Sequence, residues 1–190
     1  MQSLGIIGHG DFGRFLETLA KRYLPGVAVR VHARKATPDG VRFFSLEEAC
    51  QSDIVVIAVS IRAFEEMLLK LLPLLGPRSI LIDVNTVKMH PAQLLRRHAG
   101  NRVWAATHPM FGPYSFEKQG SALQDLRLVI ADHTLPDAVM ARHLAVRRQD
   151  PLLLRCHIVF DAGGRPVEFA EVHYVSARFT LSIEMRREAK

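Results

Sequence analysis

Short apolar runs alternate with longer stretches of helical period over the first 150 residues of the chain. The runs at 4–8, 27–32, 53–59 and 79–84 are rich in Val, Ile and Leu, and runs at 102–107 and 127–131 continue the series. Between them, apolar residues recur every three or four positions, as on one face of helices at 11–23, 63–72 and 91–98. This alternation predicts an α/β fold with a doubly wound parallel sheet.

Local signals mark several helix ends. Ser45 is followed three residues later by Glu48, the spacing of a capping box, which predicts a short helix there. Thr134 and Asp137 are N-cap residue types and predict a helix that runs to about residue 148. The predicted elements therefore continue without a break to about residue 150.

Beyond Asp150 the period changes from that of helices to the strict alternation of strands. Alternate positions of 152–160 and of 179–185 are apolar, with a glycine-containing turn at 161–165 and a middle strand at 167–174 between them. This pattern predicts a small C-terminal antiparallel β meander over 151–190. So small a sheet cannot bury its own apolar face, so it must pack on residues 1–150 or on another subunit.

A glycine-rich loop joins the first predicted strand to the first predicted helix. It has the pattern G-x-G-x-x-G and reads Gly8-His9-Gly10-Asp11-Phe12-Gly13. The first glycine allows a tight turn, the second lets the backbone approach a pyrophosphate, and the third lets the helix pack closely on the strand. Residues 1–150 are therefore predicted to be a Rossmann-type dinucleotide-binding domain, in which Val59 and Ser60, at the end of the third strand, also border the cofactor.

The end of the second predicted strand indicates which dinucleotide is bound. A site for NAD offers Asp or Glu there to the ribose 2′-hydroxyl. Here the segment after His32 reads Ala33-Arg34-Lys35, with two cations and no carboxylate. This favours the 2′-phosphate of NADP over NAD, although both cations could instead be ordinary charges of an exposed loop.

Composition narrows the remaining function classes. The 190 residues are 48% hydrophobic and carry a formal net charge of +6, but Lys and Arg are scattered, so no nucleic-acid partner is expected. No apolar stretch is long enough for a membrane span. A strand begins within three residues of Met1, which leaves no room for a signal peptide and predicts a cytoplasmic protein. Cys50 and Cys156 lack metal-ligand spacing and are interpreted as reduced structural thiols.

Two polar segments follow later strands, at the sheet edge where open α/β folds bind ligands. Residues 83–88 contain Thr86 and Lys88, and residues 107–113 contain His108 between Thr107 and Pro109. A histidine held in a proline-containing loop has a pKa suited to accepting a proton. His108 is thus a candidate general base, with a hydrogen-bonded surface histidine as the alternative.

Together, the glycine loop, the segment D-V-N-T-V-K at 83–88 and H-P-M-F-G-P at 108–113 resemble the prephenate/arogenate dehydrogenase family. The segment H-A-R-K at 32–35 is similar to that of NADP-using arogenate dehydrogenases, and the likeness covers about residues 3–133. It implies oxidative decarboxylation of a cyclohexadienyl carboxylate in tyrosine biosynthesis. In that reaction hydride leaves the carbon that bears the hydroxyl, carbon dioxide leaves the opposite carbon, and the ring becomes aromatic.

The resemblance also implies roles for three residues. His108 would bind the ring hydroxyl and take its proton, and Thr86 occupies the place of a family serine that helps to hold this hydroxyl. Lys88 would neutralise a substrate carboxylate or a cofactor phosphate, or else form a supporting ion pair. The sequence departs from the family pattern at Tyr114, where a glutamate is usual, and in lacking the family's helical C-terminal domain.

The C-terminal segment has a likeness of its own. Residues 155–187 resemble the closing strands of the UTRA domain, the ligand-sensing module of GntR-type repressors. Arg155, Glu168 and Arg178 are candidate ligand contacts, although exposed strand charges are the more ordinary interpretation. No winged-helix region precedes this segment, so DNA binding is not implied.

Three functions remain open. The first is an NADP-dependent dehydrogenase acting on a cyclohexadienyl carboxylate, the second a dinucleotide- or metabolite-binding sensor without turnover, and the third a dehydrogenase for another small acid. The apolar meander favours a homodimer in which strands pair between subunits. A monomer in which the meander folds back on its own sheet is the alternative.

Overall fold

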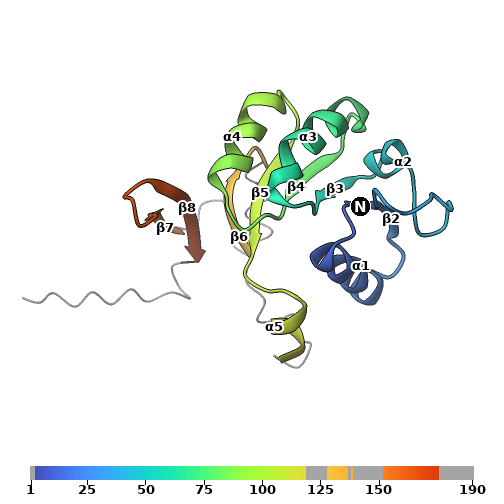
Figure 1. Ribbon diagram of the computed structural model, residues 1–190, viewed down its shortest axis with the longest axis horizontal. Coiled ribbons are helices and arrows are strands. Elements are labelled where there is room, and N and C mark those ends of the chain that lie inside the picture. Colours follow the sequence, from blue (N-terminus) through green and yellow to red (C-terminus); the bar gives the residue numbers. More distant parts are fainter. Residues whose placement is uncertain (1–2, 119–127, 137, 139–151, 176–190) are drawn as a thin grey trace, which may run out of the picture.

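The computed structural model describes residues 3–118, 128–136, 138 and 152–175 (Figure 1). Six strands form the main sheet: β1 (Ser3–Ile7), β2 (Ala28–His32), β3 (Ile54–Ile57), β4 (Ile80–Asp83), β5 (Trp104–Pro109) and β6 (Leu128–His133). The helical segments are α1 (Asp11–Tyr23), α2 (Leu46–Cys50), α3 (Ile61–Leu71), the 3₁₀ turn η1 (Leu72–Leu74), α4 (Met89–His98) and α5 (Pro113–Lys118). The α/β architecture predicted from the sequence is confirmed.

The strand order is β2-β1-β3-β4-β5-β6, and the first five strands are parallel. Because the chain goes from β1 outward to β2 and then crosses back to β3, the winding reverses between β1 and β3. In Figure 1, α1 and α5 lie on one side of the sheet and α3 and α4 on the other. Both faces of the sheet are thus covered by helices, as expected for a doubly wound fold.

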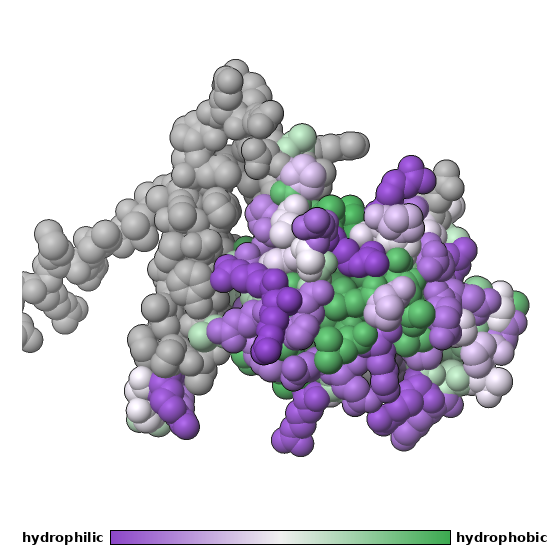
Figure 2. All heavy atoms as spheres, turned by 90° about the horizontal axis from the view of Figure 1, so that it is seen from above, coloured by the Kyte–Doolittle hydropathy of each residue, from purple (hydrophilic) through white to green (hydrophobic). Residues whose placement is uncertain are grey.

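Alternation along the strands divides the core between these two faces. Val55 and Ile57 of β3 pack with Phe64 and Leu68 of α3, and all four are fully buried. Val56, between them in the sequence, lines the other face of the sheet with residues of α1. Figure 2 looks onto the side of α3 and α4, where the apolar surface forms a patch surrounded by polar residues.

Cys50 also lies in the core, and burial raises the pKa of its thiol to about 11, which keeps it protonated.

The sixth strand departs from the parallel pattern. β6 pairs antiparallel with β5, with an irregularity in register between Ala106 and Thr107. The apolar run at 127–131 predicted a strand but carried no information about its direction. The hydroxyl of Thr134 accepts the N–H of Trp104 and donates to the carbonyl of Arg102, so it closes this strand pair. Of the predicted helix at 134–148, residue 137 and residues 139–148 lie outside the described residues.

The C-terminal segment begins with a hairpin. β7 (Leu152–Phe160) and β8 (Pro166–Val175) form a separate antiparallel pair, and β8 lies against β6 and α4. The carboxylate of Asp161 accepts the backbone N–H groups of Gly163 and Arg165, which fixes the predicted turn. The third predicted strand, at 179–185, and the candidate contact Arg178 lie outside the described residues. No helix in the described part of the chain has the length and apolar character to cross a bilayer.

Candidate functional site

The glycine loop is shaped by close backbone packing at both of its ends. Gly8 has φ +110°, and its N–H donates to the carbonyl of His32 at 2.9 Å. A Cβ at Gly8 would lie 2.3 Å from the carbonyl oxygen of Ala58, and one at Gly13 would lie 2.2 Å from the carbonyl oxygen of Gly8. Gly8 is therefore required because the end of β1 lies so close to the backbone after β3, and Gly13 because α1 packs so closely on the glycine loop.

The middle glycine has a different surrounding. A Cβ at Gly10 would meet no atom within 4 Å, so the space beside this backbone is open. Gly10 is also the N-cap of α1, and no side chain there caps the first helical N–H groups. Open space, first-turn N–H groups and the positive end of the helix dipole together fit the pyrophosphate of a dinucleotide.

A cleft with a volume of about 340 Å³ opens beside this helix end. It gathers the glycine loop and the carboxyl ends of three parallel strands. Its lining consists of Gly10, Asp11, Phe12, Ala58, Val59, Ser60, Val84, Asn85, Thr86, Pro109 and Phe111. Five predicted cofactor residues, Gly10, Asp11, Phe12, Val59 and Ser60, thus share one cleft with the predicted catalytic residue Thr86.

A buried ion pair lies beneath the cleft. The ammonium of Lys88 donates to one oxygen of the Asp83 carboxylate and to the carbonyl oxygen of Thr107, the latter at 2.5 Å. The other Asp83 oxygen accepts the backbone N–H and the side-chain amide of Asn85, at 2.9 and 2.8 Å. Burial raises the pKa of Asp83, and the Lys88 ammonium opposes this rise. Of the two roles that the sequence left open for Lys88, this geometry matches the supporting ion pair.

His108 lies inside a strand rather than in the rigid loop that the sequence predicted. It belongs to β5, is half-buried and pairs with Val129 of β6. The antiparallel pairing with β6 extends β5 beyond its last partner on β4, and this extension takes in His108. Pro109, the next residue, lines the cleft, whereas His108 is not among the lining residues.

The predicted 2′-phosphate site lies at the end of β2. Arg34 and Lys35 are exposed and occupy a turn in which the N–H of Ala36 donates to the carbonyl of Ala33. This turn does not contribute to the lining of the cleft. Because β2 is the neighbour of β1 in the sheet, the two cations lie on the side of the glycine loop. Thr86 and His108 lie on the other side, at β4 and β5.

One cluster at this end of the site was missed by the sequence analysis. Glu17 of α1 is buried, and its carboxylate binds Lys21 (2.6 Å), His9 (2.9 Å) and both Nε and Nη2 of Arg42 (2.8 and 2.9 Å). We refer to Glu17, His9, Lys21 and Arg42 as the Glu17 cluster. Burial alone would raise the pKa of Glu17, but the hydrogen bonds from Arg42, Lys21 and His9 outweigh it and lower this pKa to about 2. The sequence contains one signal of this cluster: Glu17 lies four residues before Lys21 in the predicted helix, which is the spacing of an ion pair.

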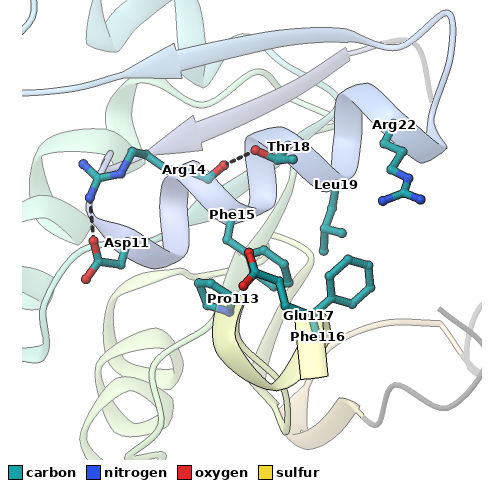
Figure 3. A pocket seen from close by; sticks show the side chains of 9 residues that line it. All are labelled: Asp11, Arg14, Phe15, Thr18, Leu19, Arg22, Pro113, Phe116 and Glu117. Atoms are coloured by element: carbon teal, nitrogen blue, oxygen red, sulfur yellow. Dashed lines mark hydrogen bonds and ion pairs between the residues drawn. The ribbon is translucent and has the colours of Figure 1, made fainter. Parts of the chain in front are cut away.

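A second hollow, of about 410 Å³, lies between α1 and α5 (Figure 3). Two of its charged side chains bind each other, since Arg14 donates to Asp11 at 2.5 Å, and the carbonyl of Arg14 accepts the Thr18 hydroxyl. Its apolar lining includes Phe15 and Phe116, whose ring centroids are 5.4 Å apart. The open backbone of Gly10 lies in the other cleft, which makes that cleft the candidate site for a dinucleotide. Helix α5 was not predicted, although Pro113 at its first position is a typical helix start.

Comparison with protein families gives two matches. The family described as the prephenate dehydrogenase nucleotide-binding domain matches residues 28–130. The UTRA domain family matches residues 129–180, a segment that begins earlier than the likeness predicted at 155–187. The two matches meet in β6.

The curated relatives of the chain are named as arogenate or prephenate dehydrogenases. Arogenate dehydrogenase 1, chloroplastic, of Arabidopsis thaliana is 35% identical over 124 residues, which are 59% of this chain and 19% of that protein. A probable arogenate/prephenate dehydrogenase of Methanocaldococcus jannaschii is 34% identical over 77 residues, 39% of this chain and 17% of that protein. This chain therefore spans less than a fifth of the length of either relative.

Solved structures show the same fold. Synechocystis arogenate dehydrogenase has a TM-score of 0.56 at 20% identity, covering 74% of this chain and 54% of that one. Prephenate dehydrogenase from Aquifex aeolicus has a TM-score of 0.55 at 21% identity, covering 76% and 57%. At these identities the likeness concerns the fold.

The depressed pKa of Glu17 predicts a pH-dependent contribution to stability. A carboxyl whose folded pKa is about 2 instead of 4.5 contributes fully above pH 4.5, and this contribution is lost as the pH falls towards 2. Replacing Glu17 by Gln should therefore lower the free energy of unfolding by about 3 kcal/mol at pH 7, since each pKa unit is worth about 1.4 kcal/mol. The difference from the unaltered protein should shrink between pH 4.5 and 2.

Urea unfolding at several pH values measures this difference. Glu66→Gln is the matched control, because Glu66 also binds a lysine four residues later, Lys70, but on the exposed surface of α3. Its effect should be much smaller. A Glu17→Gln effect that is independent of pH would contradict the ionic role of the cluster.

Proposed function

Because this chain belongs to the prephenate dehydrogenase nucleotide-binding domain family, we propose that it is the dinucleotide-binding part of an NADP-dependent oxidoreductase that oxidatively decarboxylates a cyclohexadienyl carboxylate. The observation that carries this proposal is the single cleft that brings the glycine loop together with Thr86 and the end of β5. A prephenate dehydrogenase structure from Aquifex aeolicus contains NAD⁺ and hydroxyphenyl propionate, which supports a nicotinamide dinucleotide as the cofactor here. The relatives named as arogenate dehydrogenases support the substrate class.

The cofactor is held by residues at the carboxyl ends of β1, β2 and β3. The open backbone at Gly10 and the first turn of α1 receive the pyrophosphate, and Arg34 and Lys35 receive the 2′-phosphate. Gly8 and Gly13 keep the loop in place by their close packing. When bound, the dinucleotide supplies the acceptor for the substrate hydride.

The proton chemistry is assigned to His108 and Thr86. His108 takes the proton of the ring hydroxyl, and Thr86, which lines the cleft, helps to hold that hydroxyl by hydrogen bonding. Lys88 acts as a positioning residue, since its ammonium binds Asp83 and the carbonyl of Thr107, the residue before His108. His108 is half-buried in β5 and directly precedes Pro109, which lines the cleft.

A ligand sensor is the second candidate function. The UTRA match at 129–180 favours it, because this segment covers β6, β7 and β8. In that case the cleft binds the dinucleotide but catalyses no reaction, and the C-terminal strands contact a second ligand through residues such as Arg155 or Glu168. A dehydrogenase for a different small acid is the third, and it would also keep the cleft.

Purified protein with NADP and either prephenate or arogenate tests the leading function. We expect reduced nicotinamide to form. We also expect tighter binding of NADP than of NAD in fluorescence titrations, because the residues directly after β2, Ala33-Arg34-Lys35, include two cations and no carboxylate. Binding without turnover on either substrate would favour the sensor. Equal or tighter binding of NAD would contradict the role of Arg34 and Lys35.

Replacement of His108 by Asn tests the proposed base. Turnover should fall by roughly 10²-fold or more, because a positioned base contributes about that factor to proton transfer. The dissociation constant for NADP should stay nearly unchanged, since the glycine loop holds the dinucleotide. His90→Asn, at an exposed histidine of α4, is the matched control and should leave turnover intact. Undiminished turnover in His108→Asn would remove His108 from the mechanism.

We also propose that the protein is a homodimer joined through its C-terminal strands. Alternate positions in 152–160 and 179–185 are apolar, and among the described residues β7 and β8 form a sheet of two strands, whose outer edges suit pairing with a second copy. Light scattering on the full chain measures the mass in solution, and we expect that of two chains. A monomer would instead favour a hairpin that packs only on β6 and α4 of its own chain, where β8 lies.

A further inference from the structure

The Glu17 cluster joins three segments that are distant in the sequence. Glu17 belongs to α1, His9 is the second residue of the glycine loop, and Arg42 belongs to the loop between β2 and α2. Arg42 binds both oxygens of the Glu17 carboxylate, and His9 binds one of them. A forked contact of this kind fixes orientation as well as distance.

The loop that carries Arg42 is itself well ordered by hydrogen bonds. The carboxylate of Asp39 accepts the backbone N–H groups of Val41, Arg42 and Phe43 at 2.8 to 2.9 Å. Val31 of β2 donates to the carbonyl of Arg42 and accepts from the N–H of Phe44. The loop therefore runs beside β2 as a rigid unit, which the Arg42 side chain attaches to α1.

An aromatic contact strengthens the same connection. The rings of His9 and Phe43 meet edge to face with centroids 5.2 Å apart, and the Arg42 guanidinium lies 5.0 Å from the Phe43 ring centroid. The glycine loop thus touches the loop after β2 by both an ionic and an aromatic contact. These two segments flank the place where the adenosine half of a dinucleotide binds in folds of this type.

We propose that the Glu17 cluster is a positioning device that holds the glycine loop and the loop after β2 at the spacing required by the adenosine half of the cofactor. This inference rests on the proposed dinucleotide binding. It goes beyond it, because it attributes part of the affinity for the dinucleotide to residues that do not line the cleft. Arg42 acts through Glu17, because its Nε and Nη2 bind the two carboxylate oxygens. Contact of its remaining nitrogen with the 2′-phosphate is the competing role, and the titrations below distinguish the two. The cluster therefore serves NAD and NADP alike, whereas Arg34 and Lys35 distinguish them.

Two variants of equal charge change test the proposal. Arg42→Met removes the connection between the loop and α1, while Lys21→Met removes a Glu17 partner that lies on α1 itself. We expect Arg42→Met to raise the dissociation constants of NADP and NAD by the same factor, roughly tenfold if about a tenth of the molecules keep the competent spacing. Lys21→Met should change either constant less than about twofold, because the connection stays intact.

Amide hydrogen exchange on the ligand-free proteins gives a second measurement. Exchange over residues 39–44 should accelerate in Arg42→Met and not in Lys21→Met, and thermal melting confirms that both variants are folded. Equal loss of affinity in the two variants would show a simple charge effect and overturn the proposal. Loss for NADP alone would show that Arg42 contacts the phosphate, and unchanged exchange would show no positioning; either result overturns it.

The unaltered protein separates this proposal from the proposed function. If it binds neither dinucleotide in the same titrations, the proposed function fails and the positioning role fails with it. If it binds them but Arg42→Met binds them equally well, only the role of the Glu17 cluster is overturned.

Discussion

The buried ion pair of Asp83 and Lys88 is the contact that fixes the side of the cleft formed by the ends of β4 and β5. Removing two charges from water is costly, and such a pair is tolerated only when further hydrogen bonds satisfy it. Here the amide and backbone of Asn85 bind the second Asp83 oxygen, and the carbonyl of Thr107 binds the ammonium. The ends of β4 and β5 are thereby held together, and with them the segments that carry Thr86 and His108.

The glycine-loop side of the cleft is fixed in a similar way by Glu17. Each side has one buried carboxylate that binds a cation outside its own helix or strand. Lys88, at the start of α4, binds Asp83 of β4, and Arg42, in the loop after β2, binds Glu17 of α1. The glycine loop lies between them, at the reversal of winding between β1 and β3. Carboxyl strand ends diverge at such a reversal and leave a crevice. The charged pairs do not create this crevice, but they set the positions of the loops around it.

Sequence patterns predicted the features that depend on local rules. Helix α1 has the predicted bounds, Ser45 and Glu48 form the predicted capping box, and the turn at 161–165 is closed by Asp161. The direction of β6 and the inclusion of His108 in β5 depend on which distant segments pair with each other. The hydrophobic periodicity of a sequence does not predict such pairing. The contact of Glu17 with Arg42 spans 25 positions and has no local pattern at all. The candidate site was therefore predictable as a set of strand ends, but not in its supporting contacts.

The antiparallel strand β6 explains how two segments of different likeness can share one sheet. A parallel strand requires a crossover connection, whereas an antiparallel edge strand can be added by a shorter return of the chain. The dehydrogenase match ends at residue 130 and the UTRA match begins at 129, so both include part of β6. Val129 pairs with His108 on one side of this junction, and β8 lies against β6. The backbone position of His108 consequently depends on the first strand of the second segment, and the β5–β6 ladder of hydrogen bonds couples the two parts of the chain.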